Sequence, residues 1–422
     1  MKFWSHIADT YGGIARVPLK GRHVYLISDP ALLYELLVTN RSRYRKNTRY
    51  KAAVDTFGEG LLLAEGQYWK RQRLITQPAF KTDYVRRQVP TMARLTADFL
   101  ERWSIGAGEE LQRDVGEDFL RLSQRHAGHY LMGPGFAVID DRFYTAATGI
   151  KDNWPLPPRS ILALFGPKPK GREARLHAAI ADIDRLVFSY LKEHRHDDFT
   201  DCGVLSLLVS SSRAQGDEFD DRALRDQLLT LFFAGHETSA TSLSWIHYLL
   251  WKHPEVRDRL KEEVDRVTGG DLPNAEHLEQ LEYTERVINE SLRLYSPIHS
   301  ISRVALKDDV IGGYSIPKGA MIYVSLYATH RRAEDWPDPN RFDPDRFAPE
   351  LAAARPRFSF IPFAAGHRNC VGASMAMVEL KLAVAQIAQK FTLTLVPGHR
   401  VEKAAGTTMH PRYGMKMSIR RN

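Results

Sequence analysis

The segment FAAGHRNCVG, residues 363–372, stands immediately before the last long helical pattern of the chain, which covers residues 371–391. A thiol at the start of a helix meets free N–H groups and the positive end of the helix dipole, and both favour thiolate over thiol. Gly366 and Gly372 leave room for a flat, bulky ligand, and Arg368 supplies a permanent cation for an acidic group on it. A lone cysteine is more often structural than a ligand, so the interpretation of Cys370 depends on the rest of the sequence.

The composition is that of a globular protein. Of 422 residues 43% are apolar and 26% charged, which argues against collagen, disorder and a multi-span membrane protein. This length allows two or three domains, but no repeat, low-complexity tract or linker is visible, so we expect one domain over residues 1–422. The net charge of +8 favours a basic face for an acidic protein partner over a nucleic-acid surface.

Cysteine usage narrows the chemistry further. Only Cys202 and Cys370 occur, so a disulfide framework and a multi-cysteine zinc or iron–sulfur site are excluded. This usage favours the reduced cytoplasm. The N-terminal residues 1–17 contain neither a signal-peptide core nor an anchor. Residues 228–251 are long and apolar enough to span a bilayer, but the polar run of residues 236–242 at their centre predicts a buried helix and no membrane span.

Hydrophobic periodicity predicts a mainly α fold with a smaller β part. Strand-like alternation occurs in residues 14–19 and 23–27, joined by Lys20-Gly21 as a hairpin, and again in residues 310–327. The helical patterns cover residues 69–80, 84–103, 117–131, 172–194, 220–252, 254–267 and 278–294. Two proline-rich stretches interrupt them. Residues 154–171 predict a mobile lid or an ordinary connection, and residues 335–349 predict irregular structure without a helix.

The ten residues around Cys370 resemble the haem-binding loop FxxGxRxCxG of the cytochrome P450 family. The matching positions are Phe363, Gly366, Arg368, Cys370 and Gly372, and Ala364 and Ala365 stand where the family often has glycine or serine. The resemblance implies the cytochrome P450 fold, a single haem domain with a long central helix. It also implies haem b (iron protoporphyrin IX) with the Cys370 thiolate as the axial iron ligand.

The long helical pattern carries a second resemblance. Residues 234–238, AGHET, are similar to the family's oxygen-activation motif, which places Ala234 and Gly235 against the haem. Gly235 would let the helix bulge and leave space for dioxygen, Thr238 would offer a hydroxyl to the bound oxygen, and Glu237 would relay protons through water. The alternative for Thr238 alone is a hydroxyl bonded back to the preceding turn.

Three more residues resemble the family's buried structural triad. Glu290 and Arg293 stand three apart on one helix face, and Arg346 falls between them and Cys370 in sequence. An isolated pair of this spacing is weak evidence, because exposed pairs are common. In the family's order it implies a structural cluster rather than a catalytic one.

The resemblance also implies contacts to the haem propionates. Trp69 and Arg73 match the family's WxxxR helix and share one helical face, and Arg303 matches a third position less specifically. Lys70 and Arg71 are better explained as a solvated basic face, where they could help dock an acidic redox partner.

The family implies a monooxygenase that hydroxylates an unactivated C–H bond, or oxidises a C=C bond, of a hydrophobic small molecule such as a terpenoid, fatty acid, steroid or polyketide. No reductase domain follows the haem domain in this sequence, so electrons would come from a ferredoxin or flavodoxin with its NAD(P)H reductase. Apolar pocket walls are expected from Phe57, Leu61, Leu62, Phe232, Phe233, Ile298, Ile301, Thr408 and Met409.

Three alternatives remain open. A peroxide-driven peroxygenase or an isomerase would use the same haem, and a haem sensor would bind a ligand without turnover. The acid–alcohol pair Glu237 and Thr238 favours dioxygen activation over these. A nucleic-acid binder has only the net charge in its favour.

Overall fold

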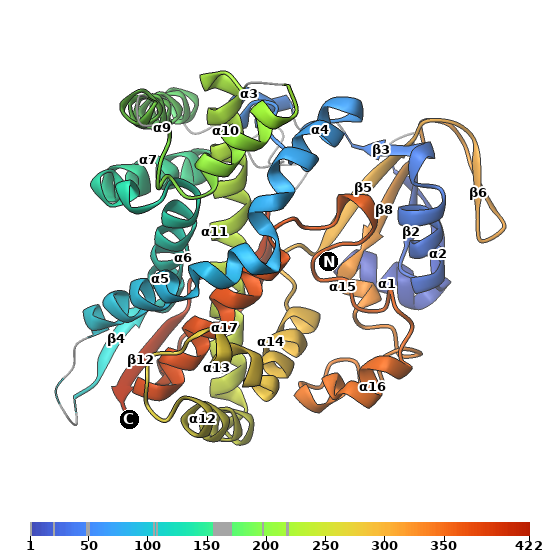
Figure 1. The fold of residues 1–422 in the computed structure, drawn as a ribbon. Coiled ribbons are helices and arrows are strands. Elements are labelled where there is room, and N and C mark those ends of the chain that lie inside the picture. The colour runs from blue at the N-terminus through green and yellow to red at the C-terminus, as the bar shows by residue number, and fades with distance from the viewer. Residues whose placement is uncertain are drawn as a thin grey trace. The chain divides into compact units, whose positions relative to one another are not determined.

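The computed structural model describes residues 2–19, 22–47, 51–103, 106, 109–154, 171–195, 198–216 and 219–422. Helices predominate and short strands gather toward the two ends of the sequence, which confirms the predicted mainly α fold (Figure 1). The chain forms two compact units. Unit 1 comprises residues 1–49, 85–120 and 238–422, and unit 2 comprises residues 50–84 and 121–237. The single domain expected over residues 1–422 stays a prediction.

Unit 2 is helical. The long helix α9 (Arg172–His194) buries Leu176, Ala179, Ile183 and Leu186, whose successive spacings of three and four residues put them on one side, and it packs on α7. Among the described residues of this unit, the other helices are α3 (Lys51–Phe57), α4 (Gly66–Thr76), α7 (Asp140–Asn153) and α10 (Val204–Ala214), with the 3-10 turns η3 (Gln77–Phe80) and η5 (Pro134–Val138).

Unit 1 contains the strands. Its largest sheet has the order β1-β2-β8-β5-β3, with β2 and β8 parallel and the other neighbours antiparallel. The strands are β1 (Ile14–Leu19), β2 (Arg22–Ile27), β3 (Tyr44–Lys46), β5 (Ser300–Ala305) and β8 (Met321–Ser325). β1 and β2 match the predicted strands, and the Lys20-Gly21 turn lies outside the described residues. Ile27, Ile322 and Val324 are fully buried and form the centre of a core under this sheet.

Three smaller sheets contain the remaining strands of unit 1 within its described residues. β12 (Lys416–Arg421) pairs antiparallel with β4 (Leu111–Asp114) and β9 (Phe391–Leu395). Two hairpins are formed by β6 (Asp309–Ile311) with β7 (Tyr314–Ile316), and by β10 (Lys403–Ala405) with β11 (Met409–Pro411).

The helices of unit 1 hold the C-terminal part of the chain. α12 (Pro254–Thr268), α14 (Glu282–Leu294) and α17 (Ala373–Lys390) pack on one another. The remaining short helices are α1 (Lys2–Tyr11), α2 (Pro30–Tyr34), α13 (Ala275–Gln280), α15 (Leu326–Thr329) and α16 (Pro349–Ala354). A π turn η1 (Glu35–Thr39) and the 3-10 turns η2 (Arg41–Arg43), η4 (Glu101–Trp103), η6 (Pro344–Phe347) and η7 (Gly366–Arg368) join these elements.

Three helices pass from one unit to the other along the chain: α5 (Thr82–Leu100), α6 (Val115–Met132) and α11 (Asp221–Lys252). α11 is 32 residues long and is the long helix predicted from the sequence. Its central polar residues His236, Ser239 and Thr241 are buried, as expected for a helix in a protein interior. Within the part of the chain that the structure describes, no helix combines the length and apolar character that a bilayer span needs.

The structure departs from the predicted elements at several points. α11 stays regular through Gly235, so the expected bulge is absent there; glycine permits a change of winding without forcing one. The pattern predicted over residues 278–294 is broken at Leu281, because Glu263 of α12 accepts the N–H groups of Tyr283 and Thr284 at 2.7 Å each.

Two further departures concern the proline-rich stretches and the helices. Pro344 starts the short turn η6 inside the stretch expected to be irregular, where Asp343 caps it by accepting from the Asp345 N–H. Residues 155–170, expected as a lid or connection, lie outside the described residues. α7 and α10 were not predicted from the sequence.

Candidate functional site

The Cys370 loop lies in unit 1, directly before α17. The Cys370 N–H donates to the Phe363 carbonyl at 2.9 Å, and the Asn369 N–H donates to the Gly366 carbonyl at 3.1 Å, which closes the loop on itself. Gly372 is the residue that precedes the first turn of α17. The Cys370 side chain is exposed, and it stands near the N-terminal end of an 18-residue helix. This is the placement that stabilises a thiolate.

Two backbone conformations shape this loop. Gly366 has φ +75°, and a Cβ built on it would lie 2.2 Å from the Leu37 carbonyl oxygen, so only glycine fits. Ala364 has φ +57°, a conformation that costs any residue with a Cβ. The alanine that departs from the family's pattern therefore sits where glycine would be relaxed.

The centre of α11 carries small and polar side chains at partly open positions. Ala234 is exposed, while Gly235, Glu237 and Thr238 are half-buried in a helix that is otherwise mostly buried. A Cβ built on Gly235 would meet nothing within 4 Å, so a ligand can approach the helix backbone there. The role of these residues in oxygen activation stays a prediction.

Glu290, Arg293 and Arg346 lie together in unit 1. Both Glu290 oxygens accept from Arg293, at 2.6 and 2.7 Å, and Arg346 Nε stands 3.6 Å from Glu290 Oε1. Glu290 also accepts the Asp343 N–H at 3.0 Å. Burial raises the pKa of Glu290, and its hydrogen bonds from Arg293 and Asp343 oppose that shift. The guanidinium of Arg293 serves three backbone carbonyls as well, those of His330, Pro339 and Arg341.

The residues expected at the haem propionates are distributed over both units. In unit 2, Trp69 is buried and Arg73 half-buried one helical turn further along α4. In unit 1, Arg303 is buried on β5 and donates to the Ser302 carbonyl at 2.9 Å, while Arg368 is half-buried in η7. An arginine has five N–H donors, so Arg303 can serve a carboxylate besides this carbonyl.

The expected pocket residues of unit 2 include three aromatic rings in contact, since the Phe232 and Phe233 ring centroids lie 5.6 Å apart. Phe57 packs against Phe233 with ring centroids 4.9 Å apart, and against Trp154 at 5.2 Å. Phe232 is buried and packs on Phe143 at 4.6 Å, in the core of the unit. Leu61 is buried and Leu62 exposed in the turn before α4. Trp154 was not predicted, and its only signal was its place at the edge of the proline-rich stretch.

The expected pocket residues of unit 1 are held by hydrogen bonds between distant segments. The Met409 N–H donates to the Pro297 carbonyl, and the Trp245 indole donates to the Met409 carbonyl, both at 2.8 Å. Met409 and Thr408 are buried, while Ile298 and Ile301 are half-buried. The first of these bonds places the segment of Ile298 beside β11.

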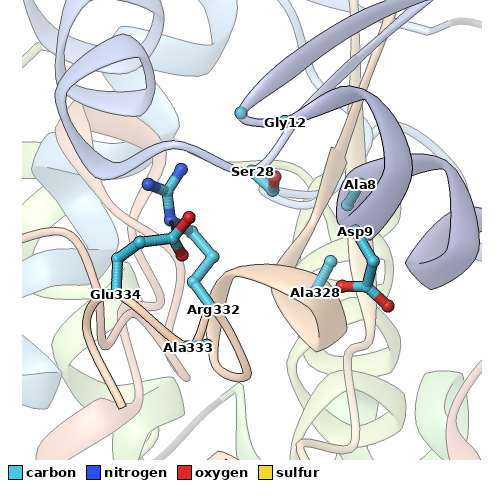
Figure 2. Close-up of a pocket in the computed structure, with 9 residues that line it drawn as sticks. Ala8, Asp9, Gly12, Ser28, Ala328, Arg332, Ala333 and Glu334 are labelled. Carbon is cyan, nitrogen blue, oxygen red and sulfur yellow. Dashed lines mark ion pairs between the residues drawn. The ribbon is translucent and has the colours of Figure 1, made fainter. Parts of the chain in front are cut away.

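A second feature of unit 1 is a cavity of about 290 Å³ that contains none of the predicted site residues. Figure 2 shows Ala8 and Asp9 of α1 on one side and Arg332, Ala333 and Glu334 on another. Gly12, Gly13, Ser28 and Ala328 complete the lining. Arg332 is tied to Asp29 at 2.9 Å. We assign no chemical function to this cavity.

Polar contacts that the sequence did not predict hold the turn before α4. Asp226 accepts the Glu59 N–H at 3.0 Å, and Gln227 accepts the Leu61 N–H at 3.2 Å. Gly58 and Gly60 approach α11 so closely that a Cβ would collide with Asp226 or Thr230. No local pattern could indicate these contacts, because they join residues about 170 positions apart.

Comparison with known proteins identifies the family to which this chain belongs. The sequence model of the family "Cytochrome P450" matches residues 1–417. The structure resembles the crystal structure of a cytochrome P450DA mutant haem domain, with a TM-score of 0.85, 26% identity and coverage of 100% of this chain and 92% of that one.

Curated relatives agree. "Putative cytochrome P450 132" of Mycobacterium bovis is 31% identical over 97% of this chain and 90% of its own length. "Cyclooctat-9-en-7-ol 5-monooxygenase" of Streptomyces melanosporofaciens is 32% identical over 92% of this chain and 84% of its own. The protein is therefore an oxidoreductase enzyme. The chain belongs to the cytochrome P450 family, which implies haem held by a cysteine thiolate.

The residues present fit that group. A soft sulfur donor stands at the end of a helix dipole, Gly366 gives the loop a conformation that a side chain would block, and open space adjoins Gly235 on α11. In unit 1, the cationic side chains of Arg303 and Arg368 suit the carboxylates of a porphyrin.

Proposed function

We propose that this enzyme is a haem-thiolate monooxygenase that inserts one oxygen atom of O2 into a C–H or C=C bond of a hydrophobic small molecule. The observation that carries the proposal is the position of Cys370. Its thiol is exposed at the start of α17, in a loop that the bonds of Cys370 and Asn369 and the left-handed Gly366 define. Haem b, when bound, supplies dioxygen activation and O–O cleavage, which thiolate ligation favours.

The chain's own residues have four tasks in this proposal, three in holding the haem and one in delivering protons. Cys370 would hold the iron through Sγ, and its own N–H donates to the Phe363 carbonyl, which fixes the backbone that carries the side chain. Arg73, Arg303 and Arg368 neutralise the propionates. Trp69, Phe363, Ala234 and Gly235 provide the surface against which the flat ligand packs.

Proton delivery is assigned to Glu237 and Thr238. Glu237 is half-buried on α11, within reach of solvent, and would relay protons, while the hydroxyl of Thr238, the next residue, would pass them on toward the haem side of the helix. The triad of Glu290, Arg293 and Arg346 takes no part in chemistry; it stabilises the segments around the cysteine loop.

The substrate class is proposed to be apolar. The aromatic group of Phe57 and Phe233 offers an apolar surface in unit 2, and a relative at 32% identity is named a monooxygenase of cyclooctat-9-en-7-ol. We propose a terpenoid, fatty acid, steroid or polyketide as substrate, with electrons from a ferredoxin or flavodoxin and its NAD(P)H reductase in the cytoplasm.

The proposal is tested first by the ferrous carbon monoxide spectrum. Cys370→Ser should lose the red-shifted Soret band of thiolate-ligated haem, and Cys202→Ser, at the buried cysteine of unit 2, should keep it. Retention of the band in Cys370→Ser would overturn the assignment of the ligand.

Turnover tests the remaining assignments. Thr238→Ala should consume more oxygen as peroxide for each product molecule formed, and unchanged coupling would remove Thr238 from the proton path. A screen for substrate-induced spectral shifts with fatty acids, terpenoids, steroids and macrolides identifies the class. If the enzyme is active with peroxide and inactive with reductase partners, its assignment changes from a monooxygenase to a peroxygenase.

A further inference from the structure

His330 stands directly after α15 and is completely buried in unit 1. Its carbonyl oxygen accepts a hydrogen bond from Arg293 Nη1 at 2.8 Å. Its ring atom Nε2 accepts the N–H of Ile361 at 3.0 Å. One residue therefore contacts both the Glu290–Arg293 pair and the segment that leads into the Cys370 loop.

The protonation of this ring follows from its contacts. Because Nε2 accepts a hydrogen bond, the proton of the neutral imidazole is on Nδ1. Burial lowers the pKa of His330 to about 3, and the cations of Arg293 and Arg331 add to the effect. The Phe360 ring packs beside it with centroids 5.4 Å apart. At neutral pH His330 is thus a fixed, uncharged acceptor.

Two backbone hydrogen bonds connect Ile361, which is held by the His330 ring, to Cys370. The Ile361 carbonyl accepts the N–H of Ala364 at 3.0 Å, which closes the turn containing Phe363. The Phe363 carbonyl in turn accepts the N–H of Cys370 at 2.9 Å. A shift of the Ile361 backbone would therefore move the acceptor that orients Cys370.

We propose that His330 is a positioning residue for the thiolate ligand: its ring fixes the backbone of the cysteine loop to the Glu290–Arg293 pair. The inference rests on the proposed role of Cys370. It predicts that loss of the ring acceptor loosens the sulfur–iron bond before the protein unfolds. A histidine that only filled space would affect unfolding and ligation together.

The test compares four variants by the half-life of the red-shifted Soret band of the ferrous carbon monoxide complex, alongside the midpoint of unfolding. His330→Leu fills similar volume but leaves the buried Ile361 N–H without its acceptor. His330→Gln can place an oxygen near the position of Nε2, and His330→Asn is too short to do so. His247→Leu is the matched control, because His247 is a buried histidine of the same unit that packs on Phe119.

The expected result is a half-life shortened on the order of tenfold in His330→Leu and His330→Asn, because a buried N–H has lost its partner. His330→Gln should keep the wild-type half-life, and His247→Leu should keep it whatever its unfolding midpoint. The proposal is overturned if His330→Leu behaves as His247→Leu, or if His330→Gln loses the band as quickly as His330→Leu. If His330→Leu fails to fold, the glutamine and asparagine variants decide by the same criterion.

The failure of this inference differs from failure of the proposed function. If the wild-type band survives in Cys370→Ser, the cysteine is not the ligand and the function proposed above fails. If the band is lost in Cys370→Ser but its half-life is unchanged in the His330 variants, only the positioning role fails.

Discussion

Arg293 donates two hydrogen bonds to Glu290, at 2.6 and 2.7 Å, and neither side chain has any exposed surface. Two buried charges are stable only when they pair with each other and form further hydrogen bonds. Arg293 also donates to three backbone carbonyls, and Glu290 also accepts the N–H of Asp343. The pair therefore joins α14 to the segment after α15 and to the segment before η6.

Removing one charge of this pair should cost more than removing both. Arg293→Met leaves a buried carboxylate and is expected to lower the free energy of unfolding by about 3–5 kcal/mol. Glu290→Met with Arg293→Met should cost less than the sum of the two single changes, because the fully buried carboxylate and guanidinium are removed together and only the partly exposed Arg346 loses a partner. Urea unfolding followed by circular dichroism measures the cycle.

Arg185→Met is the matched control for that cycle. Arg185 and Asp182 have the same i,i+3 spacing, but their side chains are 71% and 55% exposed. Loss of this pair should change the unfolding free energy by less than about 1 kcal/mol. Strictly additive single changes at Glu290 and Arg293 would contradict the expectation of a coupled buried pair.

Replacing Ala364 by glycine should stabilise the cysteine loop. Ala364 adopts φ +57°, whereas its neighbour Ala365 is extended at φ −149°. A glycine at either position raises the entropy of the unfolded chain by a similar amount. The free energy of unfolding should therefore be about 1–2 kcal/mol higher for Ala364→Gly than for Ala365→Gly, because only the first change removes the strain of a left-handed residue with a Cβ. The same urea titration measures the difference, and equal stabilities of the two variants would show that the loop relaxes the strain elsewhere.

Much of this molecule is predictable from its sequence because the relevant signals are local. The long helices α9 and α11 follow from hydrophobic period, and Cys370, Glu237 and Thr238 stand in short motifs. The roles of those residues rest on the family resemblance, since a lone cysteine or a mid-helix threonine has ordinary explanations as well.

Contacts between distant segments had no such signal. The break at Leu281 depends on a carboxylate of α12, and His330 acquires its place through bonds to residues 31 and 37 positions away. The strain at Ala364 appears only in the backbone angles. Tertiary hydrogen bonds of this kind override local propensity, and no period in the sequence records them.

Gly58→Ala should disturb the turn before α4 more than a glycine replacement at an open site. Gly58 has φ +68°, and a Cβ on it would lie 1.9 Å from Asp226 Oδ2, an atom that also accepts the Glu59 N–H. Gly66 has nearly the same φ, +62°, with nothing within 4 Å of its Cβ position. The two alanine variants therefore share backbone strain and differ in the collision.

The collision is expected to cost about 1–3 kcal/mol beyond Gly66→Ala in urea unfolding. If Leu61 and Leu62 line the substrate pocket as proposed, Gly58→Ala should also weaken the spectral response to hydrophobic ligands relative to Gly66→Ala. Equal unfolding midpoints would mean that Asp226 moves aside without loss, and equal ligand responses would remove this turn from the pocket.

A pH dependence is expected from His247, whose pKa burial lowers to about 3. The ordinary histidine pKa is about 6.5, so between these values the unfolded chain binds a proton that the folded chain does not. The free energy of unfolding therefore falls as the pH is lowered through this window, by up to about 1.4 kcal/mol per pH unit from this one residue. Above about pH 6.5 both states are neutral at this position, and the dependence vanishes.

His247→Leu and His247→Gln separate this titration from packing. Both replacements are uncharged at every pH and should flatten the slope of unfolding free energy against pH by the same amount. They should differ in the pH-independent part, because leucine packs on Phe119 and glutamine brings polar atoms into a buried site. An unchanged slope in both variants would mean that His247 is protonated in the folded protein. A protonated histidine that is buried needs a nearby anion to offset the loss of hydration. The Phe119 ring that packs on His247 is not an anion, so we expect the neutral form.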